Sequence, residues 1–205
     1  MRRDLVKPEI KSSFLSCEKD TETILRKLLI ESRPYSDTLK KLLVINTKDC
    51  LTSNNPNYQN KINSLNIKEL MEQGYIRLEP RIKFGEHEEV RSYILLSFDN
   101  FTPNENNPEY RDCTVTFDVL SHIDQWVMDD YQLRPIKIVG FIDGILNETK
   151  LSGIGKFHFM GCNELILNED IAGYTLMYRA VHDVDGDDKI TAEQAEKNAQ
   201  GVINA

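Results

Sequence analysis

The sequence is poor in the residues that hold metal ions and that cross-link small secreted domains. Among its 205 residues there are four cysteines and four histidines. The cysteines are widely spaced, with no C-x-x-C motif and no cysteine–histidine cluster of the kind that zinc requires. The histidines lack H-x-x-x-H spacing, and an isolated histidine is weak evidence of catalysis. We therefore predict reduced thiols, and no metal or cofactor site built from Cys17, Cys50, Cys113, Cys162, His87, His122, His158 or His182.

Long hydrophobic runs are also missing. No apolar stretch approaches the roughly 20 residues that span a bilayer, and the start MRRDLVKPEIKSS contains no hydrophobic signal region. We expect no membrane association, and a protein that is made in a cytoplasm and kept or assembled there.

The sequence also lacks an excess of positive charge, and it lacks catalytic motifs. The net charge is -8, so a broad grip on DNA phosphates is not expected. There is no G-x-S-x-G motif, and the stretch GIGKF at 153–157 lacks the spaced glycine and the Ser or Thr of a phosphate-binding loop. We predict no catalytic residue, and the chain is not expected to be an enzyme.

What the sequence does contain begins with a helical N-terminal region, predicted over residues 1–74. Apolar residues recur at helical spacing in DTETILRKLLIES and again in SDTLKKLLVI. The segment 46–66 is rich in Asn and Ser and shows little periodicity, which predicts a long loop. Asn66 and Glu69 then form a capping-box pattern at the start of another helix, with Gly74 as its stop.

Residues 75–182 are predicted to form an α+β core domain. Two strand patterns, in 75–84 and 90–101, suggest a β-hairpin, and RDCTVTFDVLSH alternates like a half-buried strand. Pro135 is suited to the first turn of a helix, and two further strand patterns follow. The expected fold is a mainly antiparallel sheet covered by one long helix and preceded by short N-terminal helices.

The last segment, 183–205, is predicted to be an acidic turn and a C-terminal helical arm. The stretch DVDGDDKITAEQ resembles a calcium-binding loop, but its sixth position is Asp188 rather than Gly and its twelfth is Gln194 rather than Glu. Thr191 and Gln194 fit a helix cap instead. We expect no metal site here. The weak candidate ligands are Asp183, Asp185 and Asp187.

The segment SHIDQWVMDDYQLRP at 121–135 contains the only tryptophan of the chain. Trp126 lies in a short connection from strand to helix, where it either packs in the core or anchors a protein interface. Both interpretations stay open from the residues alone. The interface candidates are Trp126, Tyr131 and Arg134.

The run from 81 to 182 resembles the tail terminator and related neck proteins of tailed bacteriophages. The resemblance rests on YRDCTVTFDVLSHIDQW, RPIKIVGFIDGIL, the GIGKFHF strand and the final GYTLMYRAVHD strand, and it covers about half of the chain. The helical N-terminal region and the acidic C-terminal extension depart from it. The resemblance is one of pattern rather than of an invariant motif.

This resemblance implies a structural protein of the virion, assembled in the host bacterial cytoplasm. Such a tail terminator or head-tail connector subunit forms a ring, commonly a hexamer, that caps the tail tube and joins it to the head. Its implied partners are further copies of itself, the tail tube protein and the head or neck connector proteins, with DNA passing through the lumen without specific binding. The alternative is a calcium-binding module or small enzymatic domain that uses the acidic cluster 183–188, or Asp118 and His122.

Overall fold

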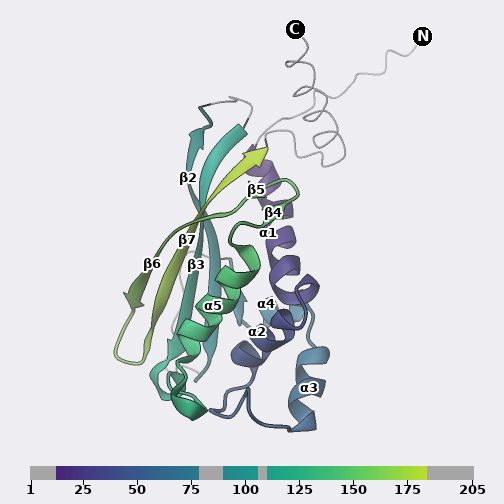
Figure 1. Cartoon of the computed structure of the whole chain (residues 1–205), viewed down its shortest axis with the longest axis vertical. Coiled ribbons are helices and arrows are strands. Elements are labelled where there is room, and N and C mark those ends of the chain that lie inside the picture. Colours follow the sequence, from purple (N-terminus) through teal and green to yellow (C-terminus); the bar gives the residue numbers. More distant parts are fainter. Residues whose placement is uncertain (1–12, 79–89, 106–109, 184–205) are drawn as a thin grey trace, which may run out of the picture.

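A computed structural model describes residues 13–78, 90–105 and 110–183. Figure 1 shows a twisted sheet with helices packed against one of its faces. The helices are α1 (Ser13–Arg26), which continues as the π-helical turn η1 (Lys27–Glu31), α2 (Tyr35–Val44), α3 (Pro56–Asn63), α4 (Ile67–Glu72), the 3-10 turns η2 (Ile123–Gln125) and η3 (Asp129–Tyr131), and α5 (Arg134–Leu146). The strands are β1 (Ile76–Arg77), β2 (Ser92–Pro103), β3 (Tyr110–His122), β4 (Lys150–Leu151), β5 (Gly155–Lys156), β6 (His158–Ile166) and β7 (Ile171–Asp183).

The main sheet has five strands in the order β1-β2-β3-β7-β6. Strands β2, β3, β7 and β6 pair antiparallel, and β3 is matched to β7 along its whole length, from Tyr110↔Asp183 to His122↔Ile171. The described part of the expected hairpin at the start is wrong, because β1 lies parallel to β2, and residues 79–84 of its predicted first strand lie outside the described residues. Parallel neighbours cannot be joined by a tight turn. The sheet is therefore mixed, though mainly antiparallel.

The strands alternate between a face that packs on the helices and a face that points away. On β3 the helix-side face carries Cys113, Val115, Phe117 and Val119, all buried in the same core cluster as side chains of α1, α2 and α5. This period of two was visible in the sequence. A smaller buried cluster is made by Tyr93, Leu95, Leu120 and Ile171.

The α+β fold is confirmed, but the covering layer is not one long helix. The longest described helix, α1, has 14 residues, and α5 has 13. Helix α5 packs on β3 and β7, α2 on β2, and α1 on β7. A helix of 13 residues is only about 20 Å long, whereas strands of the same length extend over about 43 Å. Several helices must therefore share the cover.

The N-terminal helices belong to the same core as the sheet. Leu28, Leu42 and Phe117 are each at most 1% exposed and lie in one buried cluster. The predicted boundary between residues 74 and 75 thus divides the sequence but does not divide the hydrophobic core.

The segment 46–66 was predicted to be a long loop, but it contains helix α3. The side chain of Asn55 caps this helix by accepting a hydrogen bond from the backbone N–H of Asn57, and Pro56 occupies its first turn. Ile62, a residue of this helix, is buried. The capping box of α4 is present as expected: the Asn66 N–H donates to Glu69 at 2.7 Å, and the Glu69 N–H donates back at 3.0 Å.

Candidate interaction surface

Strand β6 extends beyond the helical layer. It pairs with β7 on one side, and no strand among the described residues pairs with its other side. The helices pack mainly on β2, β3 and β7, and β6 has no buried residue. Of its nine residues, seven are exposed and two are intermediate. We call this uncovered strand the β6 overhang; Figure 1 shows it at one side of the helices.

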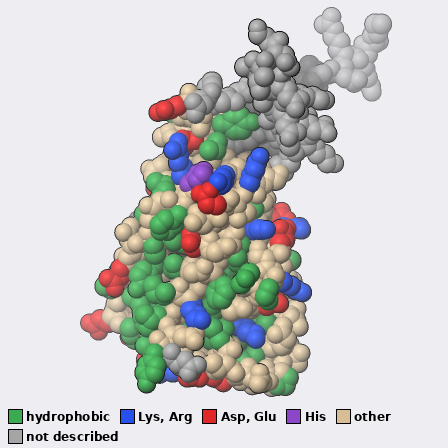
Figure 2. Space-filling view, in the orientation of Figure 1, with side chains coloured by type: hydrophobic (Ala, Val, Ile, Leu, Met, Phe, Trp, Pro, Cys, Tyr) green, Lys and Arg blue, Asp and Glu red, His purple; other side chains and the backbone are tan. Residues whose placement is uncertain are grey.

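The β6 overhang is rich in exposed apolar side chains. Phe159, Met160 and Ile166 are 48%, 56% and 67% exposed, and Leu167 follows directly at 41%. The Phe159 ring lies 6.1 Å from that of Tyr178, which is fully buried, so Phe159 continues the core outward on the helix-side face. Figure 2 shows hydrophobic side chains gathered in a band on this side of the molecule. Contiguous apolar surface of this kind is typical of protein contact sites.

The two ends of the overhang differ in their charged groups. At its beginning, Lys156 and His158 both contact Glu148, the histidine Nδ1 at 3.0 Å from the Glu148 carboxylate. Hydrogen bonds from Lys156 and then from His158 lower the pKa of Glu148. At its other end, Glu164 and the turn to β7, which contains Glu169 and Asp170, present exposed carboxylates. The cationic groups at the beginning of the strand are thus balanced by Glu148, whereas the carboxylates at its other end are exposed, with apolar residues between the two ends.

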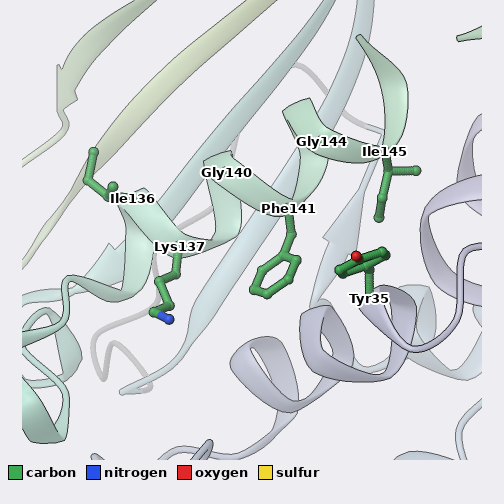
Figure 3. A pocket seen from close by; sticks show the side chains of 7 residues that line it. All are labelled: Tyr35, Ile136, Lys137, Gly140, Phe141, Gly144 and Ile145. Carbon is green, nitrogen blue, oxygen red and sulfur yellow. The ribbon is translucent and has the colours of Figure 1, made fainter.

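A groove of about 520 Å³ lies on the outer side of α5. Figure 3 shows the rings of Tyr35 and Phe141 beside one another in its lining, and their centroids are 6.2 Å apart. Gly140 and Gly144 form part of its wall, and a Cβ atom added at either one meets no atom within 4 Å. Its full lining is Tyr35, Ile136, Lys137, Gly140, Phe141, Gly144 and Ile145. The surface around α5 is thus open and mostly apolar.

Two of the predicted interface residues lie in the connection between β3 and α5. Trp126 is half-buried, with its ring 6.2 Å from that of Tyr174, so it contacts both the sheet and solvent. Tyr131 is 95% exposed at a positive φ of 57°. The bridge between Val127 and Leu133 closes the loop beneath it. Tyr131 therefore projects from the surface, and its interface role stays a prediction.

Arg134 is not available to a partner, because its side chain is fully buried. Its guanidinium donates to the carbonyl oxygens of Leu42 at 2.7 Å, Ile45 at 2.9 Å and Gln125 at 3.2 Å, and also to that of Thr47. Leu42 lies in the last turn of α2, where carbonyl groups lack partners within the helix. Burial lowers the pKa of this guanidinium, while the nearby Cys50 raises it. Arg134 joins α2 to α5 inside the subunit.

The residues considered for metal binding or catalysis are not brought together. Asp183 is the last residue of β7, and Asp185 and Asp187 lie outside the described residues. Asp118 accepts a hydrogen bond from the hydroxyl of its cross-strand partner Thr175 at 2.6 Å, and His122 accepts one from the nearby Asp124 N–H at 3.2 Å. Within the described ranges no group of three or more His, Cys, Asp or Glu side chains is placed to hold a metal ion.

Sequence reasoning missed the β6 overhang. The pattern HFMGCNELIL predicts a strand with apolar residues on both faces, and such a strand can be central or uncovered. The one usable signal was its lack of proline, lysine and arginine, which sheet edges commonly carry for protection.

Comparisons with known proteins place the chain in a family. No helix in the described part of the chain is long and apolar enough to cross a membrane. No curated protein matches the sequence. A family model described as YomW matches residues 36–180, more than half of the chain. The protein therefore belongs to the YomW family, whose phage-derived name, from a prophage region of Bacillus, indicates a phage-associated protein.

Proposed function

We propose that the protein is a structural subunit of a tailed-phage virion, a tail terminator or head-tail connector. In this role copies of the chain form a ring, a hexamer in the commonest arrangement, that caps the tail tube and joins it to the neck. The observation that carries the proposal is the uncovered β6 overhang, considered together with membership in a phage-derived family. A subunit that functions alone normally covers such a strand.

The distribution of exposed groups supports a role in assembly. The β6 overhang, the groove on α5 and the projecting Tyr131 are three separate surfaces on one small subunit. A ring subunit needs separate surfaces for its neighbours in the ring and for the rings above and below it. The net charge of -8 also suits a lumen through which DNA passes without adhering.

The test is a phage or prophage in which the gene for this chain is deleted. Particles are purified after induction, examined by electron microscopy and analysed by mass spectrometry. If the protein ends tail growth, its loss gives tail tubes of irregular length. If it only connects, its loss gives separate heads and tails of normal length. Complementation with the intact gene is the control. Normal infectious particles without the protein would refute the proposal.

A further inference from the structure

The groove on the outer side of α5, which we call the α5 groove, has the form of a site for a second helix. Among its apolar lining residues, Tyr35 and Ile136 are 56% and 42% exposed. Gly140 and Gly144 also line it, although each glycine costs a helix about 1 kcal/mol relative to alanine. A Cβ atom added at either position meets nothing within 4 Å, so packing among the described residues does not require these glycines. The close approach of another backbone would require them.

The chain leaves the described sheet beside the end of α5. Near the end of β7, the Val181 N–H donates to the carbonyl oxygen of Ile154 at 3.0 Å. The Phe157 N–H donates to the carbonyl oxygen of Thr149, three residues after α5, also at 3.0 Å. The ends of β7 and α5 are thus joined through β5. Six residues, 184–189, can span up to about 20 Å, roughly twice the diameter of a helix. The residues that follow can therefore reach the outer side of α5.

The segment 191–203 has the sequence pattern of a helix that can pack closely. Thr191 and Gln194 fit a helix cap at its start. At about 3.6 residues per turn, small and apolar side chains share one face, namely Ala192, Ala195, Ala199, Val202 and Ile203. Alanines let two helix backbones approach closely, which suits a groove lined by glycines. A helix of this length is about 20 Å long, enough to follow the groove, which extends over about 13 Å from Ile136 to Ile145.

Charge favours the C-terminal segment over the N-terminal one as the occupant. Lys137 lines the groove and Lys150 is exposed beyond the end of α5, and neither forms an ion pair with another described residue. Residues 184–203 contain two lysines and five carboxylates, the latter being Asp185, Asp187, Asp188, Glu193 and Glu196. Residues 1–12 instead have four basic side chains and two carboxylates, and would bring like charge to Lys137.

We propose that residues 191–203 lie as a helix in the α5 groove of the same chain. The alanine face contacts Gly140 and Gly144, and the carboxylates beside that face lie toward Lys137. The occupant belongs to the same chain because the six-residue linker reaches the groove without a second copy. This docking does not depend on the virion role. Its failure leaves the deletion phenotype unaffected, and a normal deletion phenotype leaves the docking unaffected.

The first experiment is hydrogen exchange of the full chain, followed by mass spectrometry. In the parent, amides of 191–203 should exchange about ten-fold more slowly than in Gly144→Leu, whose new side chain fills the groove. Lys68→Leu adds a leucine at a helix position that is 83% exposed and is the matched control, which should change nothing. Unprotected amides in the parent, or protection that survives Gly144→Leu, overturn the proposal.

The second experiment reverses the charges. Lys137→Glu should lower the protection of 191–203 about five-fold, because it places like charge beside Glu193 and Glu196. Adding Glu193→Lys and Glu196→Lys to the same chain should restore the protection. If Lys137→Glu has no effect, or if the combined variant recovers nothing, the assigned occupant is wrong.

The third experiment decides between the same chain and a second copy. A spin label on Asn198→Cys, in a chain with Cys17→Ser and Cys162→Ser, should broaden the NMR signals of the Gly140 and Gly144 amides. Spin-labelled chains without isotope are then mixed with isotope-labelled chains that have no spin label. The mixed sample should show sharp signals for both glycines. Broadening in the mixed sample would identify a second copy as the source of the helix and would contradict docking within one chain.

Discussion

Replacing Arg134 by methionine should destabilise the protein strongly although the new side chain has a similar length. The guanidinium donates to carbonyl groups of α2 and of the segment after it, including those of Leu42 and Ile45, which are 0% and 3% exposed residues. Each buried carbonyl left without a donor costs about 1–3 kcal/mol. Two such groups give an expected loss of about 4 kcal/mol in the free energy of unfolding. That is a large share of the roughly 5–15 kcal/mol of a typical domain.

Buried ion pairs can often be replaced by apolar residues without loss, but that exception does not apply here. It requires both charged partners to be removed, whereas the acceptors of Arg134 are backbone carbonyls that no substitution removes. Urea unfolding followed by the fluorescence of the single tryptophan measures the effect. Arg179→Met, which removes an exposed ion pair with Asp112, is the control and should cost less than about 1 kcal/mol. An Arg134→Met variant within about 1 kcal/mol of the parent would refute the role assigned to these hydrogen bonds.

Three further predictions concern single groups. Gly173→Ala should cost about 2–3 kcal/mol or more in urea unfolding, because a Cβ atom there lies 1.8 Å from the carbonyl oxygen of Val119, whereas Gly140→Ala, with open space, should be neutral or gain about 0.5–1 kcal/mol. The pKa of Glu148 is lowered in the folded state, so its contribution to stability is present above its unfolded pKa and is lost as the pH falls through its folded pKa. Glu148→Gln should remove this pH dependence of stability, and an NMR titration that finds an ordinary pKa for Glu148 contradicts the prediction. Calorimetric titration should detect no calcium binding tighter than millimolar, and tight binding that disappears when the three aspartates are changed to asparagine would restore the calcium hypothesis for Asp183, Asp185 and Asp187.

The parts of the fold that the sequence predicted are those with a strong local period. Alternation in 111–122 and 172–182 predicted β3 and β7, which pair along their whole length. Pro135 marked the first turn of α5. Helix α3 was missed because its eight residues are polar and only Ile62 is buried, so composition favoured a loop. Local composition is a weak guide where one buried residue and one cap decide the structure.

Arg134 shows why the long-range contacts could not be predicted. A charged residue beside a tryptophan and a tyrosine is typical of protein interfaces, and the sequence offered no reason to bury it. Its acceptors come from Leu42, Ile45 and Thr47, some 90 residues earlier in the chain. These carbonyls converge only when α2 and α5 lie on the same face of the sheet. Backbone acceptors of this kind leave no mark in the side-chain sequence.

The β6 overhang could not be predicted for a similar reason, which lies in the topology of the fold. Strands β6 and β7 each carry several apolar residues, yet β7 lies inside the sheet under α5 and α1, while β6 lies at the edge. What separates them is where the helices end, and that follows from the packing of α1, α2 and α5 rather than from the sequence of either strand. A strand that is apolar like an inner strand but exposed like an edge strand is best explained by a partner outside the subunit. This argument supports the proposed virion role, because contacts between assembled subunits cover such a face.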